Sequence, residues 1–277
     1  MRRIDAHQHF WHYDPEEYDW ISDEMAVLRR DFLPEDLEPL LRKQNMDGCV
    51  AVQARQTEEE TNYLLDFADR YEHVVGVVGW VDLQSEHLGS RLEAYQPFGR
   101  LKGIRHIVQA EADPEFMNRE AFVRGVKMLG EFDLTYDILV LEKQFPMVVR
   151  FLEQCPEQSF VLDHLGKPVI YARPTQSWIN GMKAMAEHPN VYCKLSGLVT
   201  EADWSNWTAD TFKPYLEVLA DAFGPQRLMY GSDWPVCLLA AEDYGEVAAL
   251  AQQFCNQFSA EEQAAIFGGN AARFYKL

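Results

Sequence analysis

The chain has 277 residues, 47% hydrophobic and 13% aromatic, and is long enough to bury a full core as a single domain, residues 1–277. Its 44 acidic and 25 basic residues give a net charge of −19, which disfavours nucleic acids and anionic membranes as partners. No stretch approaches the roughly 18 apolar residues of a membrane helix, and the five cysteines are widely spaced and never paired as CxxC. We therefore expect a soluble, cytoplasmic protein with reduced cysteines.

Short apolar segments rich in β-branched residues recur along the chain and predict eight strands. They cover residues 4–6, 49–54, 74–81, 101–106, 135–139, 160–164, 191–196 and 228–233. Stretches with helical periodicity lie between them, at 34–44, 58–71, 119–132, 143–154 and 211–223. Apolar strands that alternate with helices predict a parallel sheet, and eight such units fit a closed (β/α)8 TIM barrel better than an open sheet.

The stretch 10–34 separates the first strand from its helix and contains several aromatic residues, including Trp11 and Trp20. A loop of this length is usually functional, and in a barrel it lies at the end where active sites form. Its rings either wall a pocket, with Trp20 contacting the substrate, or pack on the barrel rim or a neighbouring subunit. Whether the chain forms a homo-oligomer stays open.

Histidines and carboxylates stand at the ends of three strands. His7 and His9 are two residues apart, so both imidazoles lie on one side of an extended chain and can share one metal ion. Strand six ends in Asp163 and His164, and strand eight ends in Asp233. Strand ends of a barrel point into one pocket, and three imidazoles with one carboxylate suit a zinc-like or manganese-like ion. Asp233 can instead act as a general base or cap a helix.

Polar and aromatic residues at or near other strand ends are candidates for substrate binding. They are Gln8, Gln53, Trp80, Arg105, His106, Lys194 and Trp234, in addition to Trp20. Arg105 and Lys194 interrupt apolar strands, so they either hold substrate oxygen atoms or pair with internal carboxylates such as Asp137. His106 fits a core histidine equally well, and Trp80 and Trp234 fit either pocket walls or plain core.

Taken together, these motifs resemble the amidohydrolase-related (amidohydrolase-2) branch of the amidohydrolase superfamily over nearly the whole chain. The segments that carry the resemblance are IDAHQHFW, VVGWVDL, LKGIRHIVQ, VLDHLGKP, CKLSGL and YGSDWPVC. Within that branch the chain is similar to lactonases of L-fucono-, L-rhamnono- and L-galactonolactones. The resemblance implies a barrel of the metal-dependent-hydrolase type and an enzyme of carbohydrate metabolism. Such an enzyme is a carboxylic-ester hydrolase that opens a sugar lactone to the aldonic acid.

The resemblance also implies roles for the four residues. Asp233 would activate the attacking water, and His7, His9 and His164 would surround the reacting carbonyl as metal ligands or as direct partners, with Asp233 and His164 catalytic. The wider superfamily often has a carboxylated lysine on strand four, where this chain has Arg105. We therefore expect one zinc-like ion and not two, and the resemblance leaves metal-free catalysis open.

Two other functions stay open at this stage. Similar barrels place comparable histidines and aspartates in metal-dependent decarboxylases of aromatic or muconate-type acids, and release of carbon dioxide would distinguish them. A catalytically inactive barrel could bind sugars without turning them over. The segments GIRH, CKLSG and GSDWPV favour the lactonase.

Overall fold

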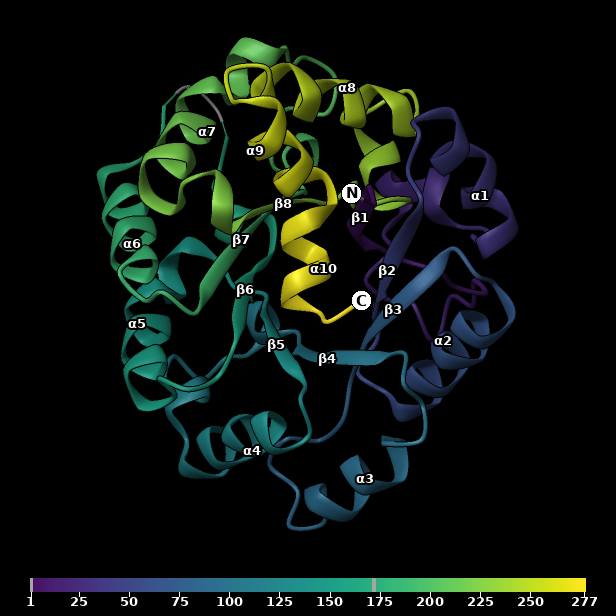
Figure 1. Cartoon of the computed structure of the whole chain (residues 1–277), viewed down its shortest axis with the longest axis vertical. Helices are drawn as coiled ribbons and strands as arrows, with labels where there is room; N and C mark the ends of the chain where they lie inside the picture. The colour runs from purple at the N-terminus through teal and green to yellow at the C-terminus, as the bar shows by residue number, and fades with distance from the viewer. Residues whose placement is uncertain (1, 171–172) are drawn as a thin grey trace.

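A computed structural model describes residues 2–170 and 173–277 and has the predicted barrel fold (Figure 1). Among these residues, eight parallel strands follow one another in chain order around one sheet. They are β1 (Ile4–Gln8), β2 (Gly48–Val52), β3 (Val74–Gly79), β4 (Leu101–His106), β5 (Thr135–Ile138), β6 (Phe160–Leu162), β7 (Val191–Leu195) and β8 (Leu228–Tyr230).

Helices surround the sheet, and the amphipathic ones bury their apolar face against it. They are α1 (Pro34–Lys43), α2 (Glu58–Arg70), α3 (Leu88–Tyr95), α4 (Glu120–Glu131), α5 (Phe145–Gln154), α6 (Gln176–Ala186), α7 (Ala209–Phe223), α8 (Tyr244–Cys255), α9 (Ala260–Ala264) and α10 (Asn270–Phe274). The five helices expected from periodicity correspond to α1, α2, α4, α5 and α7. None of the described helices is long and apolar enough to cross a membrane.

Strands β1 and β8 meet at their C-terminal ends. The backbone N–H of His9 donates to the carbonyl of Trp234 at 2.7 Å, and the N–H of Asp233 donates to the carbonyl of His7 at 2.8 Å. These two hydrogen bonds close the barrel at the level of the predicted site, so the backbone itself holds His7, His9 and Asp233 side by side.

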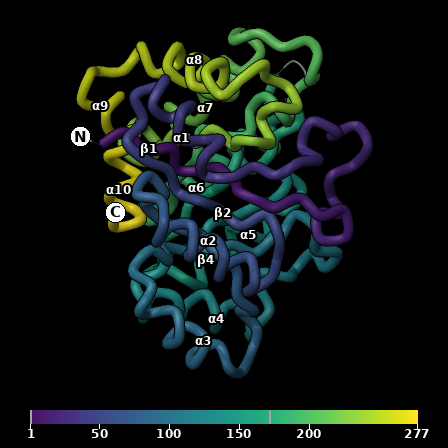
Figure 2. The backbone as a smooth tube through the Cα atoms, turned by 90° about the vertical axis from the view of Figure 1, so that its right-hand side faces the viewer, coloured from purple at the N-terminus to yellow at the C-terminus, as the bar shows by residue number. Residues whose placement is uncertain are grey.

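The two ends of the barrel differ. Apolar side chains fill the N-terminal end of the barrel, in a cluster that reaches from Ile4 at the start of β1 to Val52 at the end of β2 and also contains Ala6, Val50, Val78, Val161 and Met229. Helix α10 lies across this end in Figure 1, and Phe274 and Tyr275 pack against the same cluster. Figure 2 shows the loop after β1 projecting on the side of the molecule away from α10. The C-terminal end of the barrel is therefore the end that α10 does not cover.

A β-bulge in β1 decides which of its polar side chains face the interior. Asp5 pairs with Cys49 and Gln8 pairs with Ala51, so β1 accommodates one extra residue between these pairs. Strand alternation is interrupted there, as expected for a bulge. His7 faces the interior, whereas the Gln8 amide donates to Sγ of Cys49 at 3.4 Å, in the core between sheet and helices. The structure therefore directs Gln8 away from the barrel mouth.

Strands β6 and β8 are shorter than the sequence suggested. They end at Leu162 and Tyr230, not at residues 164 and 233. His164 and Asp233 have φ angles of 52° and 58°, in the left-handed region, which an extended strand cannot contain. These two residues lie in the tight turns that follow the strands.

Candidate active site

Three imidazoles surround one carboxylate at the C-terminal end of the barrel. Oδ1 of Asp233 lies 3.8 Å from Nε2 of His7, 3.4 Å from Nε2 of His9 and 3.9 Å from Nε2 of His164. The Nε2 atoms of His7 and His9 are 3.3 Å apart, and all four side chains are buried. The structure thus brings together the four residues predicted as the centre of the site.

Two of these imidazoles are oriented through their other nitrogen. Nδ1 of His9 donates to the carbonyl oxygen of Val52 at 2.7 Å, and Nδ1 of His164 is hydrogen-bonded to the hydroxyl of Ser196 at 2.9 Å. A partner on Nδ1 sets the tautomer and the ring orientation. Nε2 of both rings is therefore the atom that faces Asp233.

His164 stands at the start of a left-handed turn. Four consecutive residues from His164 to Lys167 have positive φ angles, of 52°, 56°, 66° and 49°. Outside glycine this conformation costs roughly 1–2 kcal/mol per residue. Gly197 leaves room for the ring, because a Cβ there would lie 2.6 Å from Nδ1 of His164. The left-handed turn and the lack of a side chain at Gly197 thus together position the imidazole of His164.

A cluster of buried charges fills the barrel beneath the imidazoles. Arg105 Nη1 lies 2.9 Å from Oδ2 of Asp163, and Lys194 Nζ lies 2.9 Å from Oδ1 of Asp163 and 2.5 Å from Oδ2 of Asp137. The Tyr275 hydroxyl donates to the same oxygen of Asp137 at 2.7 Å. Two cations balance two carboxylates, which reduces the cost of burial. Of the two roles that the sequence allowed for Lys194, pairing with an internal carboxylate or holding substrate oxygen atoms, the structure shows the pairing, and the partner is Asp137 as expected.

His7 joins this cluster to the reacting end of the barrel. Its Nδ1 lies 3.1 Å from Nζ of Lys194 and 3.3 Å from Oδ1 of Asp163, and its Nε2 lies 3.3 Å from Nη1 of Arg105. Polar contacts on both ring nitrogens hold His7 in one orientation. The cluster therefore acts as the support of this imidazole.

Burial sets the charge state of the site. It lowers the pKa of His7 well below the usual range and that of His164 to about 4, so both rings are neutral at pH 7. Burial opposes ionisation of Asp233, but the imidazoles of His164, His9 and His7 outweigh it and hold the pKa of this carboxyl below its usual range. The site therefore combines neutral nitrogen lone pairs with an ionised carboxylate.

This donor set fits one divalent metal ion. His7, His164 and Asp233 each offer one ligand atom, and these atoms lie within 4.8 Å of one another. Neutral imidazoles and a carboxylate are the ligands of catalytic zinc sites. His9 lies beside the three, with Nε2 directed at Asp233. Arg105, on β4, is not a metal ligand, and its guanidinium is bound to Asp163.

A cavity of about 820 Å³ opens above the four residues. His9, Arg105, His164 and Asp233 line it, together with Trp20 from the loop after β1. Its apolar lining includes Ile107, Leu139, Val236 and Leu239. A pocket of this size, with a few convergent polar groups on an apolar wall, is typical of small-molecule sites.

Two ion pairs stand in the wall of this cavity, and the sequence analysis predicted neither pairing. Nη1 of Arg55 lies 2.5 Å from Oε2 of Glu17, and Nζ of Lys167 lies 3.0 Å from Oε1 of Glu201. Arg55 follows β2, Lys167 follows β6 and Glu201 follows β7, so each stands in a loop after a strand. That position was a usable signal, because the βα loops of a barrel line its active site.

The other candidates for substrate binding lie in two kinds of place. Trp20, which is 38% exposed, and Arg105 line the cavity. None of the other six candidates is among the described residues that line it. Gln53 lies behind Arg105: its Oε1 accepts from Nη2 of Arg105 at 3.1 Å. Lys194 is fully buried in the charge cluster. These contacts are consistent with a structural role for Gln53 and Lys194 in supporting the site. Direct substrate binding by these two residues stays a prediction.

Trp80, His106 and Trp234 also have protein partners. The indole N–H of Trp80 donates to Nδ1 of His106 at 3.2 Å, and Nε2 of His106 lies 2.7 Å from a carboxylate oxygen of Glu111. Trp234 is 2% exposed and packs edge to face on Phe32. Trp234 therefore belongs to the core under the loop after β1.

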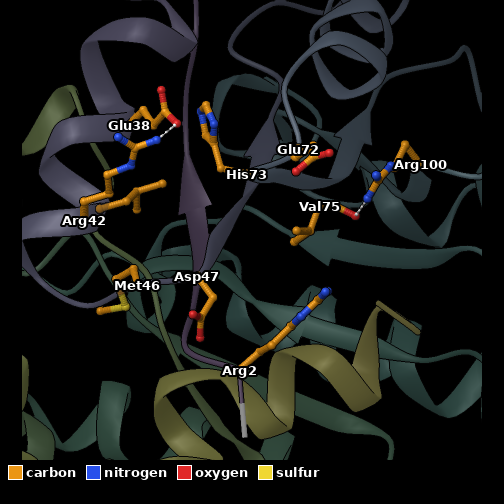
Figure 3. Close-up of a pocket in the computed structure, with 10 residues that line it drawn as sticks. Arg2, Glu38, Arg42, Met46, Asp47, Glu72, His73, Val75 and Arg100 are labelled. Carbon is orange, nitrogen blue, oxygen red and sulfur yellow. Dashed lines mark hydrogen bonds and ion pairs between the residues drawn. The ribbon is translucent and has the colours of Figure 1, made fainter.

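A second cavity, of about 620 Å³, lies at the opposite end of the barrel, near the start of strands β1 to β4 (Figure 3). Its lining mixes both charge signs, and Figure 3 shows Arg42 paired with Glu38 and Arg100 bound to the carbonyl of Val75. Active sites of TIM barrels form at the C-terminal end of the strands. The cavity above Asp233 is therefore the candidate active site.

A barrel with three histidines and an aspartate gathered at its C-terminal end defines a hydrolase of the amidohydrolase type. Residues 4–277 match the family model described as Amidohydrolase, and the chain belongs to this family. It is 44% identical to an L-fucono-1,5-lactonase from Burkholderia multivorans, over 99% of this chain and 96% of that protein. It is 38% identical to an L-fucono-1,5-lactonase from Burkholderia ambifaria, with the same coverage of 99% and 96%. The family expected from the motifs is confirmed.

The structure gives the same result. It is similar, with a TM-score of 0.97 and 44% sequence identity, to a crystal structure of an amidohydrolase from Burkholderia multivorans with bound zinc. The similarity covers 100% of both chains.

Proposed function

We propose that this protein hydrolyses a sugar lactone to the corresponding aldonic acid, with L-fucono-1,5-lactone as the first substrate to test. The observation that carries the proposal is the convergence of three imidazoles on the ionised carboxylate of Asp233 beneath a cavity of about 820 Å³. The identity of 44% to an L-fucono-1,5-lactonase supports the substrate class.

The reaction follows from the position of Asp233. As the oxygen of a water molecule adds to the lactone carbonyl carbon, the carboxylate accepts a proton from that water, and a tetrahedral intermediate forms. The bond from this carbon to the ring oxygen then breaks, and Asp233 returns the proton to the departing oxygen. Arg105 lines the same cavity, and its guanidinium would stabilise negative charge on the former carbonyl oxygen.

We propose that His7, His164 and Asp233 hold one zinc ion, with His9 beside it. When bound, zinc would act as a Lewis acid toward the lactone carbonyl. The neutral state of His7 and His164 supports this assignment, because only an unprotonated imidazole can bind a metal. The zinc in the similar Burkholderia multivorans structure supports the choice of metal.

Other features of the protein stay predictions. We expect Trp20 to cover an apolar face of the sugar ring, because its indole lines the cavity above the polar floor. The single-domain organisation over residues 1–277 and the cytoplasmic location are further predictions, and whether the chain forms a homo-oligomer stays open.

The experiment that tests this function is a hydrolysis screen with a pH indicator over L- and D-aldonolactones, run on protein of measured metal content. We expect acid release from L-fucono-1,5-lactone, and no carbon dioxide from aromatic or muconate-type acids in a parallel assay. Failure to hydrolyse any lactone in the screen would refute the proposal.

The variant Asp233→Asn tests the role of the carboxylate. We expect turnover to fall by at least about 1000-fold, in line with the loss of a general base. The fold should be retained, because asparagine has nearly the same shape and tolerates the φ of 58° at this position. A variant with near-normal activity would show that another group accepts the proton.

A further inference from the structure

The ion pair of Lys167 and Glu201 stands in the wall of the active-site cavity. Nζ of Lys167 lies 3.0 Å from Oε1 of Glu201, and the two side chains are 23% and 19% exposed. Both line the cavity that His164 and Asp233 also line. The pair is thus partly buried, yet open to whatever molecule fills the cavity.

The backbone places this pair close to the reacting residues. Lys167 ends the left-handed turn that begins at His164, and its N–H donates to the carbonyl of His164 at 2.8 Å. The backbone N–H of Ile170 donates to the carbonyl of Glu201 at 3.0 Å, which ties the loop after β6 to the loop after β7. A lysine with a φ of 49° is conformationally costly, and such strain is concentrated at functional sites.

The other ion pair of the wall differs in its surroundings. Glu17, the partner of Arg55, is 53% exposed and belongs to the long loop after β1. Arg55 itself is only 12% exposed, but both members of the Lys167–Glu201 pair are more enclosed than Glu17, so both of them can make hydrogen bonds to a ligand that are less weakened by solvent. Of the two pairs, Lys167–Glu201 is therefore the better placed to discriminate between substrates.

We infer that Lys167 and Glu201 together bind two neighbouring hydroxyl groups of the sugar lactone and thereby select hydroxylated lactones over plain ones. The inference rests on the proposed lactonase function. An ammonium group only donates hydrogen bonds and a carboxylate only accepts them, whereas a hydroxyl group does both. Two vicinal hydroxyls can accept from Lys167 and donate to Glu201 while the ion pair persists. A lactone without hydroxyls leaves both groups without these partners and gains nothing from them.

The test compares two six-membered lactones, L-fucono-1,5-lactone and unsubstituted δ-valerolactone, on the zinc-loaded full chain. The variants are Lys167→Met, Glu201→Gln and the double variant, which removes both charges together. We expect KM for the sugar lactone to rise about 10- to 100-fold in each, as for loss of hydrogen bonds to charged groups, with kcat changed less than about threefold. Activity on δ-valerolactone should stay within about threefold of that of the unaltered protein.

Glu38→Gln is the matched control. It makes the same chemical change in an ion pair, with Arg42, at the opposite end of the barrel, and should leave both KM values unaltered. Unfolding temperatures of all variants separate lost binding from lost folding. A fall in kcat at constant KM, an equal loss on both lactones, or no loss at all would each overturn the inference. If the unaltered protein hydrolyses no lactone, the proposed function fails first and the inference fails with it.

Discussion

The variant Gly197→Ala tests whether the position of the His164 ring matters for the reaction. In Gly197→Ala the new Cβ would lie 2.6 Å from Nδ1, 2.7 Å from Cγ and 2.8 Å from Cβ of His164. Ordinary contact begins near 3.4 Å, so the ring must retreat by about 0.8 Å and its hydrogen bond to Ser196 must stretch. A displacement of about 1 Å in a catalytic site costs on the order of 100-fold in rate. We expect kcat/KM for L-fucono-1,5-lactone to fall by about that factor.

A second glycine separates this effect from backbone strain. Gly197 and Gly224 have nearly equal φ angles, 67° and 64°, but a Cβ on Gly224 would meet no atom within 4 Å. Both alanine variants should lose about 1–3 kcal/mol of stability, because a positive φ is costly for alanine at either position; Gly224, with a ψ of 165°, lies in a region that is almost restricted to glycine. Only Gly197→Ala should also lose activity. Equal activity of the two variants, measured with the initial-rate assay and matched by unfolding curves, would refute the reasoning.

Three further predictions concern the buried support of the site and the metal. Tyr275→Phe removes the hydroxyl that donates to Asp137 at 2.7 Å. This variant should lower the free energy of unfolding, measured in urea, by about 1–3 kcal/mol. An unchanged free energy of unfolding would show that water replaces the lost donor. Burial raises the pKa of Glu60 from 4.5 to about 7, so the folded protein holds this proton more tightly than the unfolded chain does. The contribution of Glu60 to stability is therefore present below about pH 4.5 and is lost as the pH rises toward 7, by roughly 3 kcal/mol. Urea unfolding between pH 5 and 8 should show the unaltered protein losing stability relative to Glu60→Gln as the pH rises, and a difference that does not change with pH would contradict the shift. Removal of zinc with a chelator should lower both kcat and the unfolding temperature and readdition should restore them, whereas full activity of metal-free protein would favour a metal-free mechanism.

The main features of the site could be predicted from the sequence because they depend on local patterns. Eight strands that alternate with helices favour a barrel over an open sheet, and a barrel directs the ends of all its strands to one pocket. His7, His9, His164 and Asp233 could therefore be grouped although they are more than 220 residues apart at the extremes. The charge of Arg105 in an apolar strand also pointed to an internal partner, but the sequence suggested Asp137, and the structure pairs Arg105 with Asp163.

The sequence by itself determined the fold class and the chemical types in the site, since both follow from periodicity and from residues at strand ends. The orientation of those residues was decided only in the tertiary structure. The bulge in β1 depends on pairing with β2, and it turns His7 inward and Gln8 outward, against simple alternation. The position of the His164 ring, at the start of the left-handed turn, depends on the space left by Gly197, which lies in the loop after β7. Both features arise from contacts between distant segments, which no local pattern encodes.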